Sequence, residues 1–163
     1  MQNDLSLEDI ARYTDVFYIG GTKVGALFGE AVVISKPELK PDFRYSIKQH
    51  GGMLAKGRLL GIQFETLFED GLYWEISSHA MRMAEKIHDK FSKLGVAFTV
   101  PSPTNQIFVA LPNVALEALA SEYKFEPMGK MNDTHSVVRI CTSWATKEEN
   151  VDALLADIER VLS

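Results

Sequence analysis

The sequence has a single cysteine, Cys141, among its 163 residues. One cysteine excludes an intrachain disulfide and any zinc site built on cysteine ligands. We interpret Cys141, which lies inside an apolar run, as an unreactive thiol of the core. The histidines share no spacing typical of metal ligands, so we predict no metal site; they are His50, His79, His88 and His135.

Long apolar runs and clusters of basic residues are also absent. No run approaches the roughly 18 residues that suggest a membrane span. The chain has 17 basic and 22 acidic residues, a formal net charge of -5, and no segment gathers Lys and Arg as nucleic-acid surfaces do. The first residues, MQNDLSLEDIARYTD, are acidic and polar, unlike a signal or transit peptide. We therefore expect a cytoplasmic protein without nucleic-acid or membrane partners.

The clearest pattern that is present is helical. Between residues 72 and 94, apolar residues recur at spacings of three and four, which predicts an amphipathic helix with Gly95 as its C-terminal cap. After it, we predict strands at 96–100, 106–111, 123–125 and 136–141, with a loop at 129–134. A helix capped by Asn113 and a final helix begun by a Thr146–Glu149 capping box complete a small α+β layer.

The front of the chain predicts an incomplete sheet. We expect a short helix at 5–12 capped by Ser6, a buried strand at 15–19, a second strand at 30–34, and a helical region at 43–70 around Gly51 and Gly52. Two strands without neighbours are poorly protected. They are typical of the end of a larger sheet.

The run DVFYIGGTKVGALFG places Lys23 just past a strand end, among small residues. A phosphate-binding P-loop is excluded because the first glycine of its motif is missing and Val24 follows the lysine. Two interpretations remain open on the residues alone. Lys23 is either a solvated turn lysine, or a Schiff-base lysine that small neighbours leave open to a flat ring.

Two stretches carry a family resemblance. DVFYIGGTKVGALFGEAVVI and KQHGGMLAKGRLLGIQFETLFEDGLY strongly resemble the low-specificity threonine aldolases, grouped with the β-eliminating amino-acid lyases. These are pyridoxal-phosphate enzymes of the aspartate aminotransferase fold type (fold type I). The resemblance covers nearly the whole chain, and its last third matches mainly in layout. It implies that Lys23 forms the Schiff base with pyridoxal 5'-phosphate and that Thr22 helps to bind the cofactor phosphate.

The resemblance also implies the domain plan. Family members are much longer, so the chain resembles the C-terminal half of an α/β, fold-type-I enzyme. Residues 1–70 would be the remnant of the cofactor-binding large domain, 71–95 a connecting long helix, and 96–163 the small α+β domain. The family's phosphate loop, ring-stacking aromatic residue and pyridine-binding aspartate would lie in the other half.

Further site residues follow from the resemblance. Arg139, in the last strand, matches the arginine that binds the substrate carboxylate; the alternative is an edge residue or ion-pair partner. Lys48 matches a basic residue that reaches the neighbouring subunit's cofactor phosphate, and the alternative is a solvated helix lysine. We rank His50 low as a catalytic base. We expect Asn105 to shape a turn, His79 and His88 to be solvated, and His135 to start a strand.

The expected activity is that of a pyridoxal-phosphate-dependent amino-acid lyase: retro-aldol cleavage of a β-hydroxy-α-amino acid, such as threonine, to glycine and an aldehyde. We expect a truncated or half chain with at most trace activity alone. One alternative is a catalytically inactive fragment that associates with an N-terminal half-chain or with itself as a homo-oligomer. Another is β-elimination on the same fold. The base for the substrate hydroxyl is not identified.

Overall fold

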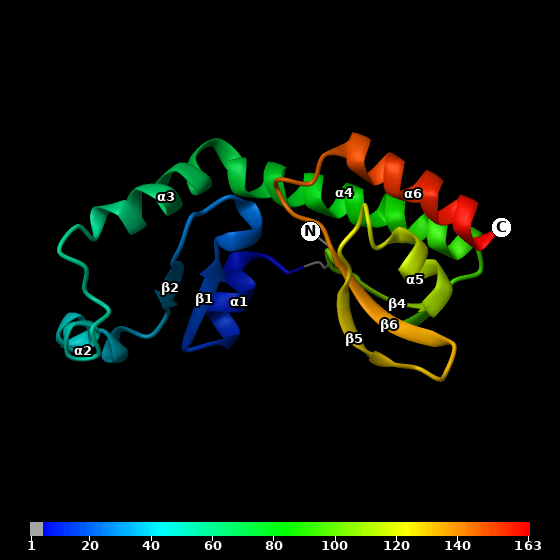
Figure 1. The fold of residues 1–163 in the computed structure, drawn as a ribbon. Helices are drawn as coiled ribbons and strands as arrows, with labels where there is room; N and C mark the ends of the chain where they lie inside the picture. Colours follow the sequence, from blue (N-terminus) through cyan, green and yellow to red (C-terminus); the bar gives the residue numbers. More distant parts are fainter. Residues whose placement is uncertain (1–4) are drawn as a thin grey trace. The chain divides into compact units, whose positions relative to one another are not determined.

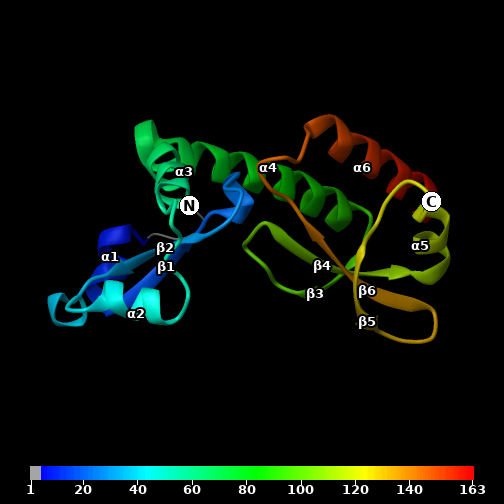
Figure 2. The ribbon, with the colours of Figure 1, turned by 60° about the vertical axis from the view of Figure 1, so that its left-hand side comes forward.

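The computed structural model describes residues 5–163 and divides into two compact units. One unit ends at Glu75 and the other runs from Ile76 to Ser163, so the division falls within helix α4 (Leu72–Lys93). Figures 1 and 2 show the ribbon of each unit. Among residues 5–163, no helix is both long and apolar enough to cross a membrane.

The first unit is built around a two-stranded antiparallel sheet. Its elements are α1 (Leu7–Tyr13), β1 (Val16–Gly20), the 3-10 turn η1 (Thr22–Val24), β2 (Glu30–Ile34), the 3-10 turn η2 (Pro37–Leu39), α2 (Phe43–Gln49), α3 (Arg58–Phe68) and the 3-10 turn η3 (Glu69–Gly71). The predicted Ser6 cap is confirmed, because its side chain accepts from the backbone of Asp9 in a capping box. The predicted helical region at 43–70 is interrupted between α2 and α3, where Gly51 has a φ of 75°.

The predicted burial of the first strand is wrong. Val16 pairs with Ile34 and Tyr18 with Val32, yet Tyr18 is 71% exposed and Val16 is also exposed. A two-stranded sheet has two faces and two free edges, and the described residues of this unit do not cover them all. The strands lie within one residue of the predicted positions, but they form an open sheet.

The second unit packs helices against a four-stranded antiparallel sheet. The strand order is β3 (Ala97–Val100), β4 (Gln106–Pro112), β6 (His135–Cys141) and β5 (Glu126–Lys130), so β4 and β6 are central. Helices α4 and α6 (Glu148–Leu162) run side by side along one face of the sheet, with α5 (Asn113–Leu119) beside them (Figures 1 and 2). Their contact forms the main core, which includes Met83, Ile87, Phe91, Val109, Leu111, Val138, Leu155 and Ile158.

The predicted end of the long helix is confirmed. Gly95 has a φ of 71°, a left-handed conformation that favours glycine. The amide of Val96 donates to the carbonyl of Phe91 at 3.0 Å, and the amide of Gly95 donates to that of Ser92 at 3.1 Å. These two bonds form a Schellman motif, which satisfies carbonyl groups that the helix end leaves unpaired.

Several local predictions in this unit are wrong. The strand predicted at 123–125 is instead β5, at 126–130, because the pairing partner β6 reaches Glu126 and not Tyr123. Asn113 is not a cap, since its amide group bonds Asp133 and Ser136.

The cap predicted for the final helix is also wrong. The hydroxyl of Thr146 accepts from the amide of Ser143 at 2.9 Å, so it serves the preceding turn and not helix α6. The cap position of α6 is Lys147, without a side-chain cap bond. The buried face predicted for this helix is confirmed at Val151, Leu154, Leu155 and Ile158.

Candidate functional site

Lys23 lies on a tight turn that follows β1. The amides of Val24 and Ala26 both donate to the carbonyl of Gly21, at 3.1 and 3.0 Å. Gly25 then leaves the turn with a φ of 98°, a conformation that side chains other than glycine rarely adopt. Val24 and Ala26 are buried, whereas Lys23 is exposed. The turn therefore anchors its apolar side chains and presents the lysine outward.

Gly21 is required by close packing beneath this turn. A Cβ atom at this position would lie 2.5 Å from the Cβ of Ala26 and 3.0 Å from Cζ of Phe64. No such overlap exists at Gly20, where the nearest atom is an oxygen of Glu30 at 4.0 Å. Gly20 and Gly21 therefore have different roles. Gly21 lets the turn pack against α3, and Gly20 leaves the end of β1 open.

Two side chains outside the motif hold the turn. The Gln63 carboxamide oxygen accepts from the amide of Leu27 at 2.6 Å, and its nitrogen donates to the carbonyl of Phe28 at 3.3 Å. The Tyr73 hydroxyl donates to the carbonyl of Gly20 at 3.1 Å. Burial raises the pKa of Tyr73. Neither residue was predicted from the sequence; for Gln63, the available signal was a glutamine adjoining the buried face of a helix.

The environment of the lysine fits an attachment point for an aldehyde cofactor. Lys23 makes no ion pair with any residue in the described range 5–163, so no carboxylate competes for its amine. The neighbouring Thr22 is exposed as well, and its hydroxyl is open to a ligand. A Schiff-base lysine also needs partial desolvation. The side chains of residues 5–163 leave Lys23 exposed, so they do not supply this desolvation.

Lys48 lies in the last turn of α2 and is exposed. It makes no hydrogen bond or ion pair to the Lys23 turn among the described residues. The ring of His50, at the C-terminal cap position of α2, bonds the carbonyl of Ser46 in the same helix at 2.8 Å. The phosphate-binding role of Lys48 and the low-ranked catalytic role of His50 stay predictions.

Arg139 lies on the central strand β6, opposite Phe108 of β4 and Glu126 of β5. The alternative of an edge residue is therefore wrong. Its Nη1 donates to the side-chain oxygen of Gln106 at 3.5 Å, and its Nε is buried without a hydrogen-bond partner among residues 5–163. Across the described part of the chain, Arg139 forms no ion pair. A half-buried guanidinium with an unpaired donor fits a carboxylate ligand, because an unsatisfied buried donor is costly.

Three further residues singled out from the sequence are Cys141, His79 and Asn105, and their observed environments can be compared with the predictions. Cys141 is exposed, so the core interpretation is wrong: alternation along β6 puts it on the same side as Arg139, away from the buried Val138. His79 is also not simply solvated, because its Nε2 lies 2.7 Å from the carbonyl oxygen of Thr146. Asn105 donates to the carbonyl of Thr142 at 2.6 Å, which connects the turn before β4 to the segment after β6.

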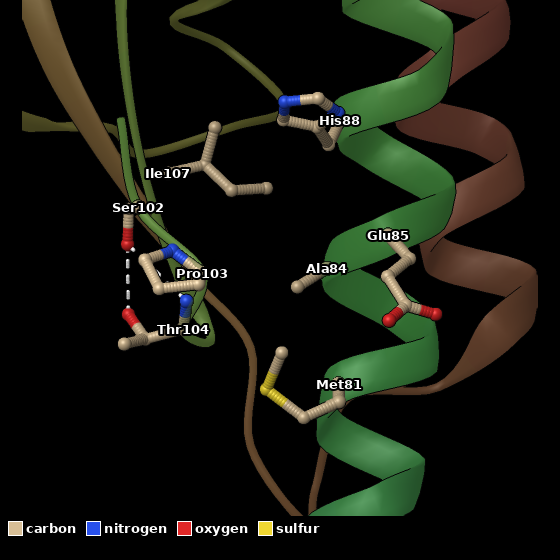
Figure 3. Close-up of a pocket in the computed structure, with 8 residues that line it drawn as sticks. All are labelled: Met81, Ala84, Glu85, His88, Ser102, Pro103, Thr104 and Ile107. Carbon is tan, nitrogen blue, oxygen red and sulfur yellow. Dashed lines mark hydrogen bonds between the residues drawn. The ribbon is translucent and has the colours of Figure 1, made fainter. Parts of the chain in front are cut away.

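A separate pocket opens between α4 and the segment before β4 (Figure 3). It has a volume of about 160 Å³, and Ala84, Ile107 and Met81 supply apolar lining. Figure 3 shows the Ser102 and Thr104 hydroxyls joined by a hydrogen bond of 2.9 Å, with His88 on the helix side. None of the predicted site residues lines it. Within residues 5–163, no group of three or more His, Cys, Asp or Glu side chains could hold a metal ion.

The fold has relatives among solved structures. No family model matches the sequence. A solved serine palmitoyltransferase from Sphingomonas wittichii superposes with a TM-score of 0.60 at 14% identity, over 90% of this chain and 39% of that one. At this identity the likeness concerns the fold alone. The fold is that of the C-terminal half of a fold-type-I pyridoxal-phosphate enzyme.

More specific matches come from threonine aldolases. A threonine aldolase structure from Leishmania major superposes with a TM-score of 0.95 at 41% identity, over 99% of this chain and 47% of that one. Curated low-specificity L-threonine aldolases from Pseudomonas sp. (strain NCIMB 10558) and Pseudomonas aeruginosa are 34% and 31% identical, over 91% of this chain. The chain is a homologue of the low-specificity threonine aldolases and corresponds to their C-terminal half. It spans 42% of the length of these curated relatives.

Proposed function

We propose that this chain supplies the cofactor-attaching lysine of a pyridoxal-phosphate-dependent lyase of the threonine aldolase type. The reaction would cleave a β-hydroxy-α-amino acid, such as threonine, into glycine and an aldehyde. The observation that carries the proposal is the Lys23 turn: an exposed lysine on a glycine-lined turn at a strand end, without an ion pair to any residue from 5 to 163. The homology to threonine aldolases supports the same assignment.

Each predicted residue has a separate task in this proposal. Lys23 would hold the cofactor through its amine. Thr22 and Lys48 bind the cofactor phosphate. Arg139 orients the substrate by binding its carboxylate through two parallel hydrogen bonds. Pyridoxal phosphate, when bound, supplies the electron sink for cleavage of the bond between Cα and Cβ.

The same environment argues for weak cofactor binding by the chain alone. Lys23 and Thr22 are both exposed, so neither the desolvation nor most of the phosphate contacts come from residues described in this structure. Each missing charge-assisted hydrogen bond weakens binding by roughly 1.5–3 kcal/mol. We propose that the remaining contacts come from an N-terminal half-chain or from another copy, and that the chain alone has at most trace aldolase activity.

The test is cofactor capture by the purified full chain. We expect an absorbance band near ~410–430 nm after addition of pyridoxal phosphate, because that band marks attachment to a lysine. Borohydride trapping and peptide mapping should place the label on Lys23, and Lys23→Arg should remove it. Lys40→Arg is the matched control, since Lys40 is also exposed and makes no ion pair within residues 5–163. Label spread evenly over surface lysines would contradict the proposal. A threonine turnover of ~1 per second or more would contradict trace activity.

A second candidate function, association without catalysis, is favoured by the exposed apolar surface of the first unit. Leu27 is 86% exposed, Tyr13 81% and Tyr18 71%. Exposed apolar side chains are typical of an interaction site where they form a contiguous patch. Sedimentation analysis of the full chain would test it: a concentration-dependent oligomer is expected, whereas a monomer at all concentrations would contradict self-association.

A further inference from the structure

We propose that Gln63 is a positioning residue that fixes the turn carrying Lys23. The proposal deepens the function given above and rests on it, because the turn matters for catalysis only if Lys23 attaches the cofactor. It concerns a residue that lies 40 positions along the chain from the lysine and belongs to another element, helix α3.

The Gln63 carboxamide uses both of its polar atoms in a clamp. Its oxygen accepts from the amide of Leu27 at 2.6 Å, while its nitrogen donates to the carbonyl of Phe28 at 3.3 Å. The same nitrogen donates to the carbonyl of Leu59, one helical turn back, at 2.9 Å. The last bond fixes the side chain to its own helix, and the first two fasten the loop after Lys23 to that helix.

The clamped segment would be loose without these bonds. Gly25 and Gly29 flank it with φ values of 98° and 88°, a region that few other residues adopt. Leu27 is largely exposed, so its own side chain contributes little anchoring. The carboxamide therefore restrains Leu27 and Phe28, in addition to the bond from Ala26 to Gly21 that closes the turn.

The clamp is coupled to the lysine through the backbone. The Lys23 turn closes when Ala26 donates to Gly21, and Ala26 directly precedes the clamped Leu27. The opposite end of the turn is held by Tyr73, whose hydroxyl donates to the carbonyl of Gly20. Gln63 and Tyr73 thus bracket the turn, and fixing its backbone fixes the direction in which the Lys23 side chain leaves it.

A glutamine meets both requirements of this place. It offers an acceptor to one amide and a donor to the next carbonyl, which leucine cannot do. Glutamate at the same position would keep the acceptor for Leu27 but lose the donor for Phe28. The Gln63→Leu and Gln63→Glu variants therefore separate complete from partial loss of the clamp.

The deciding experiment is amide hydrogen exchange in the full chain, measured by NMR. In Gln63→Leu we expect the amides of Val24, Ala26 and Leu27 to exchange at least about tenfold faster, because a lost hydrogen bond lowers the cost of local opening. Gln63→Glu should retain most of the protection at Leu27. Gln49→Leu is the matched control, since Gln49 is exposed and makes no side-chain hydrogen bond within residues 5–163. Unchanged exchange at Val24 and Ala26 would overturn the proposal.

A second readout separates positioning from simple packing. The fraction of pyridoxal phosphate trapped on Lys23 should fall in Gln63→Leu and be partly restored in Gln63→Glu. The amides of the buried Phe64 and Leu67 should stay protected from exchange in both variants, which shows that α3 is still folded. If Gln63→Leu unfolds the first unit, Gln63→Glu decides alone. Faster exchange with undiminished labelling of Lys23 would overturn the positioning role. If the wild-type chain does not label Lys23, the proposed function fails, while the exchange rates still decide whether Gln63 fixes the turn.

Discussion

At the scale of single residues, the buried hydroxyl of Thr142 ties a loop to the long helix. Thr142 is 1% exposed, and its hydroxyl donates to the carbonyl of Ala80 at 2.7 Å. Thr142→Val keeps the shape of the side chain but removes the donor. We expect a loss of about 1 kcal/mol in the free energy of unfolding, measured with urea. Thr99→Val, on an exposed position of β3, is the control and should change it by less than about 0.5 kcal/mol. Equal effects would contradict the role of this bond.

A second residue-scale prediction concerns the carboxylate of Asp157. Arg160 donates to one of its oxygens at 2.7 Å and Tyr123 to the other at 2.8 Å. These two bonds lower the pKa of Asp157 below its usual 3.8, and the bond from Arg160 has the larger effect. Because the pKa is lowered in the folded state, the ionised carboxylate of Asp157 stabilises the folded chain above pH 3.8. This stabilisation is lost as the pH falls through the folded-state pKa.

Tyr123→Phe removes one of the two donors. The pKa of Asp157 should therefore rise towards 3.8, which carboxyl NMR titration would measure. Tyr13→Phe serves as the control, since Tyr13 is exposed and forms no side-chain hydrogen bond in the described structure. A pKa of Asp157 that is unchanged in Tyr123→Phe would show that Arg160 alone sets it.

At the scale of elements, the end of α4 depends on the backbone of Gly95. Its φ of 71° is unfavourable for a residue with a Cβ atom. Gly95→Ala should lower the free energy of unfolding by about 1–2 kcal/mol, while Gly95→Asn should lower it less, because asparagine tolerates this conformation better. Among residues 5–163, no atom would crowd a Cβ at this position, so the difference would report conformation and not packing. Thermal unfolding of the two variants would measure these losses. Equal losses of unfolding free energy in Gly95→Ala and Gly95→Asn would contradict this reasoning.

Elements with a long repeating pattern could be predicted from the sequence, and those fixed by pairing could not. Helix α4 was predicted within one residue, because its buried residues recur with helical spacing from Ala80 to Phe91. Strand β5 is exposed along its whole length, so no apolar alternation indicated it. Its position depends on pairing with β6, which a local pattern does not contain.

The candidate site shows the same division. The sequence predicted the Lys23 turn because glycines and a strand end are local features. Gln63 and Tyr73 reach that turn from distant parts of the chain, so their role depends on tertiary contact. The exposure of Cys141 could not be read from its apolar neighbours either, because the face of β6 that the helices cover is set by the packing of the sheet.

At the scale of the whole molecule, the two units differ in how much they bury. The main core cluster lies entirely in the second unit. In the first unit, the buried apolar residues are few: Val24, Ala26, Phe64 and Leu67. We expect the amides of β1 and β2 to exchange about a hundredfold faster than those of β4 and β6 in the full chain, because local opening costs less where little surface is buried. Equal protection of the two sheets would contradict this expectation.

The placement of the two tryptophans has a practical consequence. Trp74, in the first unit, packs edge-on against Tyr73 at 5.2 Å between ring centroids, and Trp144 lies in the second unit in the loop after β6. The sequence has no other tryptophan. Each unit therefore carries its own fluorophore, and the indoles are 37% and 54% exposed. With either one replaced by phenylalanine, the emission of the other would follow the melting of a single unit, and two coincident curves would mean that the units unfold as one.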